Sequence, residues 1–99
     1  MNMQQMMIQA QKMQRELQKA QAELAKKEFK ASKAGLVTVV ALGNKQVVSI
    51  NIEEDGYDLE NKEMVEELIA SALNELFEQI DEENEVIQER ITGKSGLGF

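Results

Sequence analysis

The chain has 99 residues, of which 42% are hydrophobic and 29% charged, and its formal net charge is −7. A chain of this length forms one domain with a small core, so a long element that projects from the core needs a partner. The absence of cysteine and histidine excludes thiol nucleophiles and Cys-based metal sites, and removes the commonest general base near neutral pH. We therefore expect no enzyme, cofactor, metal or small-molecule substrate.

Charge is divided unevenly along the chain. Residues 1–33 hold seven Lys or Arg against three Glu, a sum of +4, whereas residues 34–99 hold four against fifteen acids, a sum of −11. The first third is thus a basic segment attached to an acidic body. No run approaches the roughly 18 apolar residues that span a bilayer, and the opening lacks a signal-peptide pattern. These features predict a cytoplasmic protein without a membrane partner.

A helix is predicted over residues 3–27, about 36 Å long. Apolar residues recur there at spacings of three and four, which is an a/d heptad pattern, and neither Gly nor Pro interrupts the helix-forming residues. The positions of this apolar seam are Met3, Met6, Ala10, Met13, Leu17, Ala20 and Leu24.

Strand patterns follow at residues 29–33, 36–42 and 46–53. Their alternation and the "GNK" between the last two predict an antiparallel sheet. Whether the hairpin loop is Gly43–Asn44 or Asn44–Lys45, the pairing has the same parity, so one face of the hairpin should form the core. The residues of that face are Val37, Val39, Ala41, Val48, Ile50 and Ile52.

A second long helix is predicted after a polar loop, with Asp58 or Asn61 as its N-cap and Gly93 at its end. From Met64 to Ile80 its apolar residues form a wide stripe of period 3.6 that can cover the sheet. Beyond this stripe the helix is acidic and only sparsely apolar. We expect it to continue past the sheet.

Both helices are longer than the strands, so both should overshoot the sheet and form an arm. Their connections make the two helices antiparallel if they pack together. The arm would then carry Met3, Met6 and Met7 on the first helix. Opposite them we expect Ile87 and Ile91 of the second helix.

The basic residues of the first helix lie on one side of it. Lys12, Lys19 and Lys26 share heptad position c, and Arg15 lies beside them at position f. These four residues, the basic stripe, suit a DNA phosphate backbone, although a solvated helix face gives the same pattern. Neither a base-reading motif nor an aromatic platform accompanies the stripe, so sequence-specific readout is not indicated.

Three other patterns have simpler explanations than a ligand site. The methionines near the start could bind Cu(I) or anchor the chain to a membrane, but packing at a helix interface is the commoner role. Residues 51–62 resemble a calcium loop, except that Lys62 stands where a bidentate Glu is needed. The acidic residues 81–89 are typical of a solvated helix end.

The ordered residues resemble the YbaB/EbfC family of nucleoid-associated proteins over most of the chain. The resemblance rests on "MIQAQKMQRELQKAQAELAKKEF", on the central "KAGLVTVVALGNKQVVSINIEED", on "NKEMVEELIASALNEL" and on the closing "GKSGLGF". The chain departs from the family pattern at Lys33, where many members have glycine, and in a tail without the common proline-containing ending.

The resemblance agrees with an α+β fold of helix, three-stranded antiparallel sheet and helix, in one α-β-β-β-α domain over residues 1–92 with a flexible Gly-rich tail over 93–99. It implies a homodimer whose sheets join and whose helices project as tweezer-like arms that bind double-stranded DNA in the nucleoid. By matching position, the phosphate contacts would be Lys12, Arg15, Lys19, Lys26, Lys27 and Lys30. Arg90 and Lys94 are secondary candidates.

One alternative of a different class stays open. Methionine-rich helical surfaces bind partner helices in other proteins. The chain would then be a protein-interaction adaptor that grips a partner helix with its Met-lined arms, and the basic stripe would only be solvated.

Overall fold

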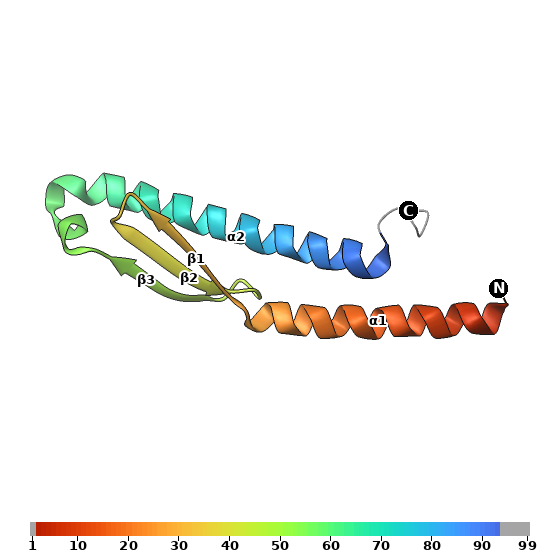
Figure 1. Ribbon diagram of the computed structural model, residues 1–99. Helices are drawn as coiled ribbons and strands as arrows, with labels where there is room; N and C mark the ends of the chain where they lie inside the picture. The colour runs from red at the N-terminus through yellow and green to blue at the C-terminus, as the bar shows by residue number, and fades with distance from the viewer. Residues whose placement is uncertain (1, 94–99) are drawn as a thin grey trace.

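The structure, a computed structural model, describes residues 2–93. The molecule is elongated, with extents of 69 × 22 × 14 Å (Figure 1). The elements in chain order are α1 (Met3–Lys26), β1 (Glu28–Lys33), β2 (Val37–Leu42), β3 (Val47–Ile52) and α2 (Lys62–Thr92), with two 3-10 turns, Glu54–Tyr57 and Leu59–Asn61, before α2. The predicted order of helix, three strands and helix is confirmed. Lys94 and the rest of the predicted tail lie outside the described residues.

The ends of the two helices follow local chemistry. The side-chain oxygen of Asn2 accepts a hydrogen bond from the backbone N–H of Gln5 at 2.8 Å, which caps α1. Asn61 precedes α2 as predicted, but its side chain donates to the backbone carbonyl of Asp55 at 3.0 Å and does not cap the helix. Gly93 ends α2 in the left-handed region, with φ 78°, as predicted.

The hairpin between β2 and β3 has a tight loop. The N–H of Lys45 donates to the carbonyl of Leu42 at 2.8 Å, which places Gly43 and Asn44 at the centre of the turn. Lys45 itself has φ 70°. The side chain of Asn44 accepts from the N–H of Gln46 at 2.9 Å, a contact that favours the turn.

The three strands form one antiparallel sheet in the order β1-β2-β3. The predicted parity of the hairpin is confirmed in its outer part, where Val39 lies opposite Ile50. Nearer the loop a bulge pairs Ala41 with Val47, so Val48 has no partner on β2.

α2 packs mainly over β1 and β2 (Figure 1). The buried residues between them are Phe29, Ala31, Val37, Val39, Ala41, Val65, Ala72, Leu76 and Ile80. The prediction that Val48 and Ile50 also belong to this core is wrong for the protomer, because their side chains are 56% and 46% exposed. α2 does not extend over β3. The apolar side chains of this edge strand are therefore largely exposed.

The helices run antiparallel, as predicted, but the predicted overlap is wrong. Leu24 and Ile80 line one cavity at the base of the arm. From that level α2 continues only about 18 Å to its end, whereas α1 continues about 32 Å to Met3. The methionines at the start of α1 therefore lie beyond the end of α2, not beside Ile87 and Ile91, and Met3 is 77% exposed (Figure 1).

Candidate nucleic-acid interface

The four residues of the basic stripe are exposed along α1. The opposite side of the helix holds Ala20 and Leu24, which are buried against α2. Lys12 and Lys26 are separated along the axis by about 21 Å, the length of roughly six steps of a DNA strand at 3.4 Å each. The predicted stripe is therefore a straight row of cations on the outer side of the arm.

Ion pairs divide the lysines of the protein into two groups. Three pairs link a lysine to a carboxylate of α2: Lys27 to Glu83 at 2.6 Å, Lys33 to Glu75 at 3.3 Å and Lys45 to Asp81 at 2.8 Å. Within residues 2–93, no residue of the basic stripe takes part in an ion pair. The protein thus pairs three lysines near the sheet with α2 and leaves those of the stripe, like Lys30 on β1, without an ion pair in this range.

The other candidate DNA contacts differ from the stripe in their surroundings. Lys27 is paired with Glu83 and lies over the ring of Phe29, with its ammonium 5.2 Å from the ring centroid. Lys30 is exposed on β1, where it alternates with the buried Phe29 and Ala31. It therefore points away from α2, on the opposite face of the sheet.

Arg90 is exposed in the last turn of α2 and lines a shallow cavity with Glu23, Lys27 and Glu83. Two of these neighbours are carboxylates, so the surroundings of Arg90 are more acidic than those of the stripe. The secondary role of Arg90 in DNA contact stays a prediction. The structure gives no position for Lys94, which lies outside the described residues.

The β2–β3 loop fixes the base of the arm, a role that the sequence reasoning missed. The N–H of Gly43 donates to the carbonyl of Lys27 at 2.9 Å, and a Cβ on Gly43 would overlap the backbone carbonyl of Leu24. Only glycine permits this approach of the loop to the end of α1. The turn pattern gave no sign of it, because the contact joins distant parts of the chain.

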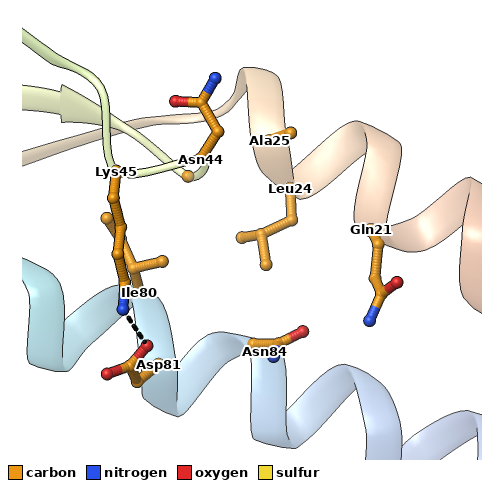
Figure 2. Close-up of a pocket in the computed structure, with 9 residues that line it drawn as sticks. Gln21, Leu24, Ala25, Asn44, Lys45, Ile80, Asp81 and Asn84 are labelled. Carbon is orange, nitrogen blue, oxygen red and sulfur yellow. Dashed lines mark ion pairs between the residues drawn. The ribbon is translucent and has the colours of Figure 1, made fainter.

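The same loop also contacts α2 (Figure 2). The Lys45 ammonium lies 2.8 Å from the Asp81 carboxylate and 5.9 Å from the centroid of the Phe77 ring. Beside this pair, a cavity of about 280 Å³ separates the helices, with Gln21 and Asn84 on its two sides. The loop therefore lies between the helices and holds both at the point where the arm leaves the sheet.

An exposed apolar surface lies at the opposite end of the molecule from the arm. Besides β3, the segment before α2 exposes Tyr57 and Leu59, and these two residues line a cavity of about 330 Å³ with Ile52 and Val65. Exposed apolar side chains on an unpaired edge strand are typical of an interface.

Neither a metal cluster nor a membrane span occurs in the part of the chain that the structure describes. Over residues 2–93 no group of three or more His, Cys, Asp or Glu side chains is arranged to hold a metal ion. In the same range no helix is long and apolar enough to cross a membrane.

A row of exposed cations on one helix of an elongated α+β protein is typical of proteins that bind a polyanion. Comparison with known proteins is more specific. The model of the YbaB/EbfC DNA-binding family matches residues 1–95, and the chain belongs to this family.

Relatives agree with this membership, and a solved structure agrees with the fold. The chain is 47% identical to a nucleoid-associated protein of Clostridium novyi (strain NT) over 94 residues, which are 94% of this chain and 82% of that protein. It is also 47% identical to one of Clostridium botulinum (strain Hall) over 97 residues, 97% of this chain and 86% of that protein. The crystal structure of the uncharacterized protein HP0035 from Helicobacter pylori has the same fold, with a TM-score of 0.77 at 22% identity, over 93% of this chain and 98% of that one.

Proposed function

We propose that the protein is a homodimeric nucleoid-associated protein that binds duplex DNA through phosphate contacts of the basic stripe, and that it acts in nucleoid organisation and gene regulation. One observation carries the proposal. On a chain of net charge −7, the cations of the stripe are exposed and unpaired within the described residues, whereas Lys27, Lys33 and Lys45 are paired with carboxylates of α2.

The acidic body does not prevent such binding, because the stripe lies on the far side of α1 from α2. The two sides of a helix are separated by about 10 Å. This distance exceeds the Debye length of about 8 Å at physiological salt. A phosphate in contact with the outer side of α1 therefore lies within a Debye length of the stripe and beyond a Debye length from the carboxylates of α2, which are the more strongly screened.

Binding through the stripe releases counterions and reads no bases. If one arm engages four phosphates, the slope of log affinity against log salt is about −3.6, and two arms double it. Affinity should depend little on sequence, because side chains on a rod outside the grooves contact the backbone of every duplex equally.

We infer that the two protomers join at β3 and the adjoining apolar surface. Val48 and Ile50 are exposed on an edge strand, which is an aggregation hazard unless a partner covers it. A shared sheet would bury them and would bring two arms into one particle. Valine to aspartate substitutions test this interface, since Val48 and Val86 have nearly equal exposures of 56% and 58% but lie on β3 and on α2.

In sedimentation velocity, Val48→Asp should convert the dimer to a monomer, because a charge buried at the interface lacks a partner. Val86→Asp should leave the dimer intact. Equal effects of both substitutions, or an intact dimer in the Val48 variant, would place the interface elsewhere.

The DNA proposal is tested by fluorescence anisotropy of a labelled duplex titrated at several salt concentrations. Lys12→Glu with Lys19→Glu should weaken binding to unrelated duplexes by at least about tenfold and reduce the salt slope. The matched control compares Lys19→Glu with Lys62→Glu. Both lysines are exposed and the change in net charge is equal, but Lys62 starts α2 at the far end from the arm (Figure 1). Because Lys62 lines the cavity beside the proposed dimer interface, sedimentation velocity first verifies that this variant is still a dimer.

We expect the Lys62 variant to bind like the unchanged protein, within about twofold, since screening isolates distant charges. Preserved affinity in the double variant would remove the stripe from the mechanism. Equal losses in the two single variants would mean that net charge and not position controls binding.

The bare methionines at the start of α1 favour a second candidate, an adaptor that grips a partner helix. Met6→Ser with Met7→Ser separates the two functions. The change removes apolar surface and no charge, so it should abolish capture of a partner helix while the salt-dependent binding of DNA persists.

A further inference from the structure

The arm tip, residues 3–13 of α1, continues an interface that α2 fills only in part. Near the sheet the apolar seam is buried, with Ala20 and Leu24 covered by α2. Further along the arm, Leu17 and Met13 of α1 and Ile91 of α2 are partly buried. Beyond them Met3 and Met6 of the same seam are 77% and 56% exposed, because α2 has ended.

The chemistry of the arm tip specifies its partner. Residues 2–11 contain no charged side chain. The positions that flank the seam carry Met7, Gln9 and Gln14, and the first charge beside the seam is Glu16. A suitable partner is therefore an uncharged apolar helix face, since a charged one would lose its hydration without gaining an ion pair. The arm tip itself is such a face.

We propose that the arm tip binds the arm tip of a second copy of the chain as an antiparallel helix pair. In an antiparallel heptad pair, a positions lie opposite d positions. Met3 and Ala10 occupy a, and Met6 and Met13 occupy d. Pairing Met6 with Ala10 of the second copy brings Met3 opposite Met13, which closes four layers symmetrically, two of Met against Ala and two of Met against Met.

This register also fits the rest of the arm. The second copy's helix runs antiparallel to α1, which is the direction of α2. In the proposed register its position 13 lies level with Met3, and its position 3 lies level with Met13, close to the level where α2 ends. The second copy thus takes up the seam where α2 ends, and its first turn meets the last turn of α2 there.

The pairing leaves the basic stripe exposed. Lys12 and Arg15 occupy positions c and f, away from the seam. DNA binding and tip pairing are therefore compatible, and tip pairing could link proteins on separate duplexes. The link between duplexes rests on the proposed function, whereas the pairing of tips does not.

Four layers bury less than the roughly 1,200 Å² of a stable interface, so a single pair is weak. In the assembly the tip pairing is strengthened because each dimer carries two arms and because binding to DNA raises the local concentration of the protein.

Cysteine crosslinking tests the register, because the chain has no cysteine of its own. A mixture of Met6→Cys and Ala10→Cys proteins should form a mixed disulfide on mild oxidation, faster than either variant alone. Ile8→Cys is the matched control, since Ile8 is as exposed as Met6, at 57% and 56%, but lies at position f. Faster crosslinking of the Met6 variant alone, or of the Ile8 variant, would overturn the antiparallel register.

Sedimentation velocity over a range of protein concentrations tests the association itself. Met6→Glu should weaken the association of dimers into larger particles, which increases with protein concentration, by at least about tenfold. Ile8→Glu should change it by less than about twofold. No growth in the unchanged protein, or equal losses in the two variants, would overturn the proposal.

Two further measurements distinguish the proposed pairing from two other partners of the arm tip, namely residues 94–99 and a lipid surface. If the unchanged chain does not associate but a chain ending at Gly93 does, residues 94–99 occupy the tip and the proposal is wrong. If vesicles of phosphatidylglycerol bind the unchanged protein but not Met6→Glu, while the 6–10 crosslink is absent, the partner is a lipid surface. Anisotropy on the same variants reports DNA binding separately, so the pairing and the DNA function can fail independently.

Discussion

α1 and α2 are both long amphipathic helices, yet only α2 covers the sheet. From Val65 to Ile80 the apolar side of α2 is wide enough to cover two strands, and its central residues Ala72 and Leu76 are fully buried. The apolar side of α1 is only the narrow a/d seam, which suits one helix at a time. The width of an apolar face thus separates a helix that covers a sheet from one that projects and binds other helices.

The largest expected difference between the two helices is in stability, and truncating one side chain on each helix tests it. Leu76→Ala should lower the free energy of unfolding by about 2–5 kcal/mol, because a cavity forms in the core. Ile8→Ala at the exposed arm tip should change it by less than about 0.5 kcal/mol. Urea denaturation followed by circular dichroism measures both. Similar losses would show that the arm tip is part of the cooperative core.

The junction between the two helices depends on Gly43. Gly43→Ala should cost about 1–3 kcal/mol of unfolding free energy, because its Cβ would overlap the Leu24 carbonyl and displace the loop from the end of α1. Gly35→Ala is the control for backbone conformation. Gly35 has φ 65° and open space around it, so only left-handed strain of about 1–2 kcal/mol applies. If a small-angle scattering profile changes only in the Gly43 variant, the loop sets the direction of the arm.

Lysines with and without an ion pair should also contribute differently to DNA binding. Lys19→Ala should reduce the magnitude of the salt slope by about 0.9 for each phosphate that the variant no longer neutralises. Lys27→Ala should reduce it less, since Lys27 already contacts Glu83 at 2.6 Å. Anisotropy titrations at several salt concentrations measure both slopes. A larger decrease for the Lys27 variant would mean that DNA displaces Glu83 from this lysine.

The smallest expected effect concerns the ion pair on the loop. Lys45→Met removes the contact with Asp81, but both side chains are largely exposed. Exposed pairs contribute about 0–1 kcal/mol, and methionine keeps the apolar stem against Phe77. Thermal unfolding should therefore shift by only a few degrees. A larger decrease in stability would identify the loop as a stronger clamp than its exposure indicates.

Local features of the fold were predictable from sequence, and long-range ones were not. Heptad spacing defined α1, alternation defined the strands, and Gly93 ended α2, because each depends on neighbouring residues. The exposure of Ile50 depends on how far α2 extends across the sheet. The overlap of the arm depends on which level of α1 meets Ile80, and no short pattern encodes that level.

The same distinction holds for the candidate site. The stripe was predictable because Lys12, Lys19 and Lys26 recur every seven residues on one helix. The pairing of Lys27 with Glu83 joins residues that are 56 positions apart. The close approach at Gly43 likewise requires the end of α1 to lie against the loop. Sequence reasoning therefore identified the cations but not which of them the protein itself neutralises.

Because the arm tip is exposed, the cap at Asn2 also affects how much of α1 stays helical. An isolated helical segment of fewer than about 12–15 residues is marginal in water, and residues 3–10 are exposed and lie beyond the end of α2. The stability of the tip therefore rests on intrinsic propensity, on the Asn2 cap and on continuity with the supported half of α1. Its amides should exchange with solvent far faster than those around Leu76, so the reach of the arm is governed by a helix–coil equilibrium that shortens it on warming.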